Sequence, residues 1–472
     1  MFTKIRLKNF YSFKDLTFDL SDGANSCKPL AIVYGENGSG KTNLMLGFSI
    51  FIDLMRTMDV RDILEQLLYD QDSIEGANES SHKFSPKMVS YLAHILRTND
   101  SLFSECRMVG STEPVLLQYE FVINSKKGIY TVEFGVDGIS HERLEFLLQK
   151  RRGIYYDLTP DDKLINKVLF KNDVIKADLE EQIRKFWGKH TFLAIVMHEI
   201  NDKSEQYFQE GLHENFLKLI SKFYKVSCKI NATNNLHATI SKSTKGGLLS
   251  DMESGTISKD KEYYIDRTEI VLNSLFRAIN CDNKKLYYKK KINNEDRISY
   301  ELHIKKMISG QVRDLPFTLE SYGNHQIIAM LPFLLRALAG ETVVLDESDT
   351  GIHDLLYSKI ISEAIPYIKG QLIITTHNTL LLDINNIKDF VYIMRQNEEA
   401  DREVVPIALA GDRIYQQTSI KNKYLVGAYG GAPHVDVINF KEMIDTLSKS
   451  NFSECPKKNE GGFDSGDTSC EN

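Results

Sequence analysis

The sequence predicts an α/β protein, and three observations support this fold class. A glycine-rich segment, Gly35 to Thr42, separates a short apolar run from a helical pattern that begins at Asn43. Two further apolar runs, at 342–345 and 370–377, lie far downstream, and each ends in residues that can carry chemistry. Short apolar runs of this kind are typical of parallel strands buried on both faces, whose carboxyl ends meet at one edge of a sheet.

The glycine-rich segment matches the phosphate-binding pattern G-x-x-x-x-G-K-[ST] in full. Its glycines let successive backbone N–H groups face the phosphates, while Lys41 reaches the β- and γ-phosphates and the hydroxyl of Thr42 binds Mg²⁺. We therefore predict that the chain binds ATP and Mg²⁺. The predicted nucleotide-binding residues in this segment are Gly35, Glu36, Asn37, Gly38, Ser39, Gly40, Lys41, Thr42 and Asn43.

The apolar run at 342–345 is followed directly by Asp346 and Glu347. In phosphoryl transfer one carboxylate holds Mg²⁺ through water, and the next can orient or deprotonate the attacking water. We assign Asp346, with Thr42, to the metal and Glu347 to the catalytic base. An apolar run that ends in acids is a weak motif alone, because many strands end in acids.

Two further segments extend the predicted site. His377 ends the run at 370–377 and is a candidate sensor of the γ-phosphate, so we count it as catalytic with Lys41 and Glu347. A histidine that caps a strand end is the alternative. Ser321 and Gly323 precede a helical pattern, and the free N–H groups of a helix N-terminus suit a triphosphate. A plain helix cap is the alternative for Ser321.

The patterns divide the chain into four parts. Residues 1–145 contain strand-like alternation and the phosphate loop, and residues 314–450 contain the downstream motifs. Both parts are predicted to form one nucleotide-binding lobe. Residues 146–313 are predicted to form a mostly helical inserted lobe, and the polar tail at 451–472 is predicted to be disordered.

Composition excludes several classes of protein. A net charge of -7 argues against a protein that coats nucleic acid by bulk attraction. The six cysteines show no C-x-x-C spacing, which disfavours a disulfide or zinc framework and fits a reducing compartment. The longest apolar run is far below the roughly 20 residues needed to span a bilayer. We expect a cytoplasmic protein without a membrane segment.

The order of these motifs along the chain resembles that of the ATP-binding-cassette (ABC) class of P-loop ATPases. Within that class the chain is similar to the compact bacterial branch related to the overcoming-lysogenization-defect proteins and to RecF and Rad50 heads. The similarity rests on 8–14, on 345–353, which resembles a Walker B motif and D-loop, and on 424–433. It implies an ATPase head with a mixed sheet core, an antiparallel β part and a helical inserted lobe. It also implies a homodimer in which each ATP lies between the phosphate loop of one subunit and Ser321 of the other.

In size and layout the chain is most similar to the ATPase subunits of the PARIS antiphage defence system. This resemblance implies a regulatory ATPase that controls a separate TOPRIM-type nuclease effector and responds to a phage-encoded trigger protein. An ATP-gated DNA repair or DNA-binding protein like RecF or Rad50 is the alternative. The turn at 321–323 departs from the L-S-G-G-Q signature of transporter subunits, which disfavours a transporter.

DNA is a further candidate partner. The segment Lys284–Lys291 is basic with interleaved aromatic residues, as a surface that follows a phosphate backbone needs. A solvated strand edge protected by lysines is the alternative. Assembly beyond a dimer stays open.

Overall fold

The computed structural model describes the chain except at residues 73–98, 204, 233–234, 240–246, 280–282, 293–295, 398, 412–418, 434–437 and 451–472. The predicted disordered tail therefore lies outside the described residues. The chain divides into two compact units, Met1–Ala432 and Pro433–Asn472. The second unit contains one described helix, α13 (Phe440–Ser450). No helix among the described residues is long and apolar enough to cross a bilayer.

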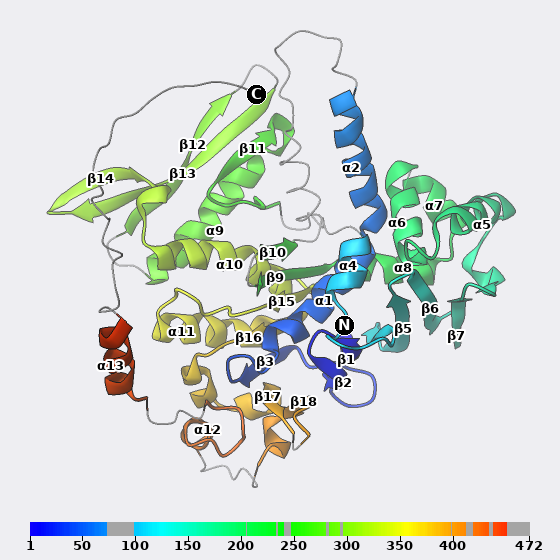
Figure 1. Ribbon diagram of the computed structural model, residues 1–472. Coiled ribbons are helices and arrows are strands. Elements are labelled where there is room, and N and C mark those ends of the chain that lie inside the picture. Colours follow the sequence, from blue (N-terminus) through cyan, green and yellow to red (C-terminus); the bar gives the residue numbers. More distant parts are fainter. Residues whose placement is uncertain are drawn as a thin grey trace, which may run out of the picture. The chain divides into compact units, whose positions relative to one another are not determined.

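A seven-stranded mixed sheet forms the core of the first unit (Figure 1). The strand order is β10-β9-β15-β16-β3-β17-β18; the five middle strands are parallel, and the two edge strands are antiparallel to their neighbours. This confirms the predicted fold class. The strands are β3 (Leu30–Gly35), β9 (Val226–Ala232), β10 (Asn235–Thr239), β15 (Thr342–Leu345), β16 (Gln371–Thr375), β17 (Val391–Gln396) and β18 (Arg402–Pro406).

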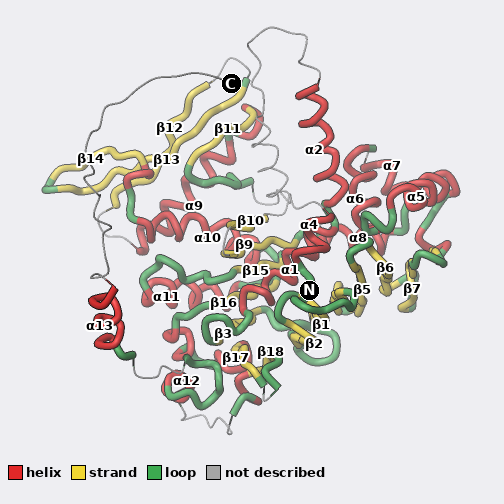
Figure 2. Tube along the Cα trace, in the orientation of Figure 1, coloured by secondary structure: helices red, strands yellow, loops and turns green. Residues whose placement is uncertain are grey.

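Helices cover both faces of this sheet (Figure 2). Alternate residues of β3 show this, because Ala31 and Val33 pack in the cluster that contains α1, whereas Leu30 and Ile32 pack in the cluster that contains α10 and α11. A strand buried on both faces needs apolar side chains at every position, which explains the uninterrupted apolar runs of the sequence. These helices are α1 (Lys41–Leu54), α10 (Tyr322–Leu338) and α11 (Asp354–Ala364).

A second, antiparallel sheet packs in the same cluster as α1. Its order is β2-β1-β4-β5-β6-β7-β8. Gln371 of the central sheet joins the two sheets, since its side chain accepts a hydrogen bond from Phe2 N at 3.0 Å and donates one to Phe2 O at 2.9 Å. The strands are β1 (Phe2–Phe10), β2 (Phe13–Asp19), β4 (Val115–Ile123), β5 (Lys126–Gly135), β6 (Gly138–Leu147), β7 (Arg152–Leu158) and β8 (Lys163–Ile165).

The segment 146–313 contains strands as well as the helices that the sequence predicts. Its first strands extend the antiparallel sheet, β9 and β10 join the central sheet, and a third sheet forms from β11 (Ser254–Ser258), β12 (Asn283–Ile292), β13 (Arg297–Ile308) and β14 (Gln311–Pro316). One face of the third sheet packs on α9, so its strands alternate apolar with charged residues, and the many charges obscure the strand period. The remaining helices are α2 (Thr57–Asp72), α4 (Asn99–Glu105), α5 (Asp173–Phe186), α6 (Phe192–Asp202), α7 (Glu205–Gly211), α8 (Glu214–Phe223), α9 (Tyr263–Ile279) and α12 (Ile420–Leu425).

Candidate nucleotide-binding site

The glycine-rich segment forms the turn between β3 and α1. Gly38 and Gly40 have φ angles of 78° and 107°, in the left-handed region that favours glycine. A Cβ atom on Gly40 would lie 2.9 Å from the ring of Phe13, and one on Gly35 would lie 2.7 Å from the carbonyl oxygen of Met394. The glycines therefore allow both the turn and its close packing against neighbouring strands.

Lys41 is only 7 % exposed and lies across this turn. Its ammonium donates hydrogen bonds to the carbonyl oxygens of Gly35, at 2.8 Å, and Glu36, at 2.9 Å. Burial lowers the pKa of Lys41, and the negative charge of Asp346 is the largest effect that opposes this shift. The phosphates of a nucleotide in the loop would compete with the two carbonyl groups for this ammonium.

Asp346 follows β15 and is 2 % exposed. Its Oδ1 accepts a hydrogen bond from Thr375 Oγ1 at 2.6 Å. Burial raises the pKa of Asp346, while the hydroxyl groups of Thr375 and Thr42 oppose the shift. Oδ2 has no hydrogen-bond partner among the residues that the structure describes.

The unpaired oxygen fits the predicted metal. Mg²⁺ prefers oxygen ligands and is usually held by one or two carboxylates together with waters and substrate phosphates. A buried carboxylate oxygen without a partner, beside the hydroxyl of Thr42, provides such ligands. Asp346 and Thr42 are thus the residues that would hold the ion.

Glu347 has an unusual backbone conformation. Its φ angle is 44°, its N–H donates to Thr375 Oγ1 at 2.7 Å, and its carbonyl oxygen accepts from Thr350 N at 3.1 Å. A left-handed conformation is uncommon for a residue with a side chain, and such conformations occur often at functional sites. The two backbone hydrogen bonds hold Glu347 directly beside Asp346.

Sequence reasoning missed Thr375 as a member of this site. Besides its hydroxyl contacts to Asp346 and Glu347, its carbonyl oxygen accepts from the backbone N–H of Ser348 at 3.1 Å. Thr375 is fully buried at the end of β16. The available signal was its position, as a polar residue at the carboxyl end of an apolar run.

His377 lies at the same edge of the sheet. Its backbone N–H donates to Asp349 Oδ2 at 3.2 Å, and its side chain is exposed. The turn that carries His377 is therefore tied to the turn that follows Asp346 and Glu347. Its contact with a γ-phosphate stays a prediction.

Ser321 is the N-cap of α10, and its side chain accepts a hydrogen bond from Asn324 N at 3.3 Å. The adjacent turn packs on Gly351, where an added Cβ atom would lie 2.3 Å from the ring of Tyr322. A Cβ atom on Gly323 would lie 2.9 Å from the carbonyl oxygen of Gly351. Ser321 thus acts as a helix cap within its own chain, and its contact with a nucleotide, like that of Gly323, stays a prediction.

The N-terminal and C-terminal segments both contact the phosphate loop. Asn43, the last predicted nucleotide-binding residue of the loop, donates a hydrogen bond to Ser12 Oγ at 2.9 Å. Tyr424 Oη donates to the carbonyl oxygen of Gly431 at 2.9 Å, and an added Cβ atom on Gly431 would lie 3.7 Å from Gly35 Cα. Segments more than 400 residues apart thus support one turn.

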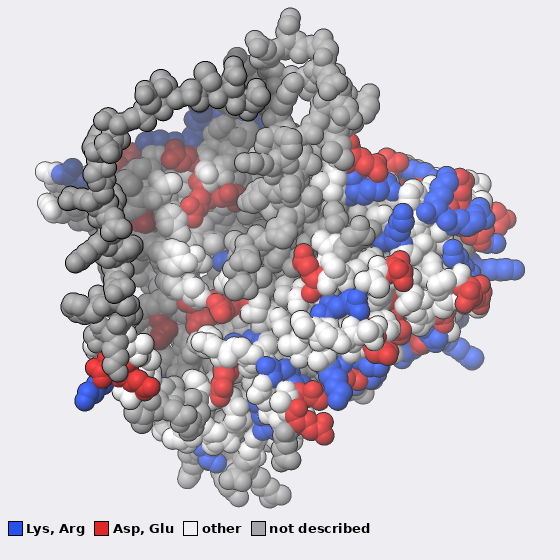
Figure 3. Space-filling model, viewed as in Figure 1, with Lys and Arg blue, Asp and Glu red and all other residues white. Residues whose placement is uncertain are grey.

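The basic segment Lys284–Lys291 lies in β12, which is an edge strand of the third sheet. Tyr288 is buried there; Lys290 pairs with Glu262 at 2.9 Å and with Asp266, and Lys289 lies 3.6 Å from Asp314. The lysines of β12 are thus partly neutralised by these acidic residues, which favours the strand-edge interpretation over a DNA surface. Elsewhere, on the face shown in Figure 3, basic and acidic side chains alternate over the lobe that contains α5 and α7.

Two protein-family models match parts of the chain. The model described as "AAA domain, putative AbiEii toxin, Type IV TA system" matches residues 212–383, and the model described as "AAA domain" matches residues 4–53. The first match includes Ser321, Asp346 and His377, and the second includes the phosphate loop. The chain therefore contains the sequence features of AAA-type P-loop ATPase domains. No curated protein matches the chain significantly.

Several solved structures match the chain at low identity and low TM-score. An SMC head bound to the C-winged helix domain of ScpA has 14 % identity and a TM-score of 0.38, covering 86 % of this chain and 96 % of that chain. The SMC head domain from Thermotoga maritima has 13 % identity and a TM-score of 0.33, with 86 % and 98 % covered. The recombination mediator protein RecF has 12 % identity and a TM-score of 0.34, with 86 % and 97 % covered.

Proposed function

We propose that this protein is a Mg²⁺-dependent ATPase that hydrolyses ATP to ADP and phosphate. The observation that carries the proposal is the meeting of the phosphate loop with the Asp346–Thr375 pair at one edge of the central sheet. Parallel pairing of β15 with β16 and of β16 with β3 places these groups together. Ligands of α/β sheets bind at this carboxyl edge.

Each residue has a distinct role in this proposal. Lys41 exchanges its two carbonyl partners for phosphate oxygens. Thr42 and Asp346 would hold Mg²⁺, which would supply positive charge beside the phosphates. Glu347 orients the attacking water and accepts its proton, and His377 contacts the γ-phosphate.

Two substitutions test these roles separately. Lys41→Ala should weaken ATP binding, because it removes the phosphate contact. Glu347→Gln should keep ATP affinity and lower kcat by about 10²-fold or more, the usual contribution of a general base. Binding of a fluorescent ATP analogue and release of phosphate would be measured for both variants. Unchanged turnover in Glu347→Gln would overturn the assignment of the base.

We further propose that ATP is hydrolysed in a two-fold dimer, with Ser321 of one subunit facing the nucleotide of the other. The exposed position of Tyr322, at 62 %, supports this arrangement, because the turn at the start of α10 is accessible to a second subunit. The N-terminal end of α10 carries the positive end of its dipole, which suits a triphosphate.

For biological role, we propose a regulatory ATPase of an antiphage defence module that restrains a separate TOPRIM-type nuclease and responds to a phage-encoded trigger. The motif order and the family description, which names a toxin of a toxin–antitoxin system, support this role. Affinity purification from the native operon should recover a nuclease subunit, and the chain alone should leave DNA intact. Metal-dependent DNA cleavage by the purified chain alone would contradict the proposal.

An ATP-gated DNA-binding protein is the second candidate, because exposed lysines do lie on β12. Lys289 and Lys291 are both exposed. If this surface binds DNA, a Lys289→Gln, Lys291→Gln double variant should weaken binding and reduce its salt dependence. Unchanged DNA binding in the double variant would exclude this surface.

A further inference from the structure

A half-open cavity of about 400 Å³ lies at the edge of the central sheet opposite to the phosphate loop. Its floor consists of residues at the amino ends of parallel strands: Pro29 precedes β3, Thr342 begins β15, and Gly370 precedes β16. The predicted catalytic residues follow the carboxyl ends of the same strands. The length of these strands therefore separates the cavity from the nucleotide site.

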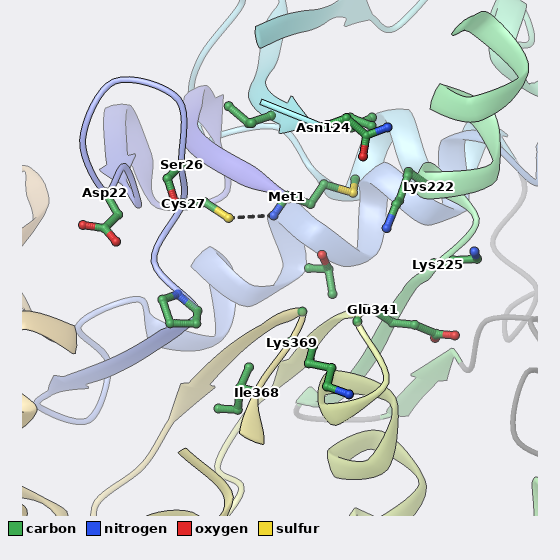
Figure 4. A pocket seen from close by; sticks show the side chains of 16 residues that line it. Met1, Asp22, Ser26, Cys27, Asn124, Lys222, Lys225, Glu341, Ile368 and Lys369 are labelled. Atoms are coloured by element: carbon green, nitrogen blue, oxygen red, sulfur yellow. Dashed lines mark hydrogen bonds between the residues drawn. The ribbon is translucent and has the colours of Figure 1, made fainter. Parts of the chain in front are cut away.

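Three lysines from separate segments line the cavity (Figure 4). Lys222 is on the last turn of α8, Lys225 precedes β9, and Lys369 precedes β16. In Figure 4, Lys222 reaches into the space from one side, and Lys369 lies on the opposite side. Neither of these two side chains forms an ion pair with a residue that the structure describes.

The acidic residues of the lining do not cancel this charge. Glu341 is buried and its carboxylate already accepts from Arg336 Nη1 at 3.1 Å, so its charge is paired within the fold. Asp22 is the other acidic lining residue, and it is exposed at the rim. Two lysines whose ammonium groups pair with no acidic residue in the described part of the chain, and a third lysine beside them, therefore leave the cavity positive.

Neutral polar groups and several apolar residues complete the lining. Asn124 contributes an amide and Thr342 a hydroxyl, while Cys27 accepts a hydrogen bond from Met1 N at 2.8 Å, drawn as a dashed line in Figure 4. A concave site with a few convergent polar groups and a volume between about 300 and 1,000 Å³ is typical of small-molecule sites.

We propose that this cavity binds a small molecule that carries a phosphate ester. Lysine ammonium groups bind phosphate as strong point charges, and a dianionic phosphate can interact with more than one of them. The cavity volume accommodates a phosphorylated sugar rather than the phosphate alone. This site is independent of the proposed ATPase, because none of its lining residues belongs to the phosphate loop or follows the carboxyl end of a central strand.

The probes are ribose 5-phosphate and unphosphorylated ribose, each titrated into the full chain by calorimetry, with thermal unfolding as a second readout. Ribose 5-phosphate should bind at least about ten-fold more tightly than ribose. A Lys222→Gln, Lys369→Gln double variant should lose at least about ten-fold of this affinity. Lys218→Gln is the matched control, since Lys218 lies one turn earlier on α8 and pairs with Glu214 outside the cavity.

Lys41→Ala separates this site from the nucleotide site. Ribose 5-phosphate affinity should be unchanged in Lys41→Ala, whatever that variant does to ATP. Ser26→Trp, which fills the rim of the cavity without changing its charge, should also block the probe and serves if the double variant unfolds. Equal binding of ribose and ribose 5-phosphate, binding lost in Lys41→Ala, or binding kept in both cavity variants would each overturn the proposal.

Discussion

Thr375 donates its hydroxyl hydrogen to Asp346 Oδ1 at 2.6 Å, and this contact joins the ends of two parallel strands whose residues are 29 positions apart. The same hydroxyl oxygen accepts the N–H of Glu347 at 2.7 Å. One side chain thus holds both the proposed metal ligand and the proposed base. Its position predicts an effect on catalysis as well as on folding.

Thr375→Val tests this relationship with a change of almost no volume. The variant loses one donor and one acceptor in a fully buried place, which should cost about 1–3 kcal/mol of unfolding free energy. It should also lower ATP turnover by about ten-fold or more, because Asp346 and Glu347 lose their shared support. Thr375→Ser keeps the hydroxyl and should restore turnover. Full activity in Thr375→Val, measured by phosphate release, would show that the contact is only structural.

Asp346→Asn should alter stability in a pH-dependent way. Burial raises the pKa of Asp346, so the folded state binds this proton more tightly than the unfolded state, and the ionised carboxylate costs stability above the raised pKa. Asparagine keeps the oxygen that Thr375 contacts and removes this cost. The variant should therefore be more stable than the native protein near pH 8, and the difference should shrink as pH falls through the raised pKa.

Urea unfolding at several pH values, without Mg²⁺, measures this difference. Added Mg²⁺ with ADP should raise the Tm of the native protein and leave that of Asp346→Asn almost unchanged, because the variant lacks the proposed charged ligand. A gain in stability for the variant that is equal at every pH would contradict the role of the buried charge.

Gly351→Ala tests the contact between the start of α10 and the turn after Asp346. Its Cβ atom would meet the Tyr322 ring at 2.3 Å, so the turn must move. We expect nucleotide binding to persist and ATP turnover to fall by about ten-fold or more, as with other small misplacements of catalytic groups. Adding Tyr322→Ala should restore part of the loss by removing the clash.

Gly427→Ala is the matched control for backbone strain. Gly427 has the same φ angle as Gly351, 78°, but an added Cβ atom there meets nothing within 4 Å. If only backbone strain mattered, both alanine variants should lose the same fraction of ATP turnover. If turnover falls equally in the two variants, the contact with Tyr322 has no role.

A mixture of two inactive variants tests the shared site. Lys41→Ala removes a phosphate contact, and Ser321→Asp keeps a good N-cap residue but places a negative charge beside the nucleotide of the other subunit. Random pairing makes half of the dimers mixed, and each mixed dimer has one intact site of two, so about a quarter of native activity should return. Subunit exchange would be shown with differently tagged copies. Normal hydrolysis by Ser321→Asp alone would leave Ser321 as a helix cap only.

The local elements around the phosphate loop could be predicted because the sequence patterns that specify them span only a few neighbouring residues. The turn at 35–42 needs glycines with left-handed φ angles, and a strand buried on both faces needs an unbroken apolar run. Both requirements act within about ten neighbouring residues, so they are visible in the sequence. The placement of Asp346 and Glu347 at a strand end follows from the same local signals, whereas the mixed sheet was implied by the family resemblance.

Strand partners and side-chain contacts depended on the tertiary structure. β9 lies beside β15, more than 100 residues later, and no local period encodes that pairing. The middle segment was predicted as mostly helical from its local pattern. Its amphipathic strands carry many charges and show no clear strand period, and their apolar residues pack on α9 and the two larger sheets. A contact of Thr375 with the site was not predicted for the same reason. A threonine at the end of a strand is compatible with many contacts, and only the parallel alignment of β15 and β16 brings its hydroxyl to Asp346.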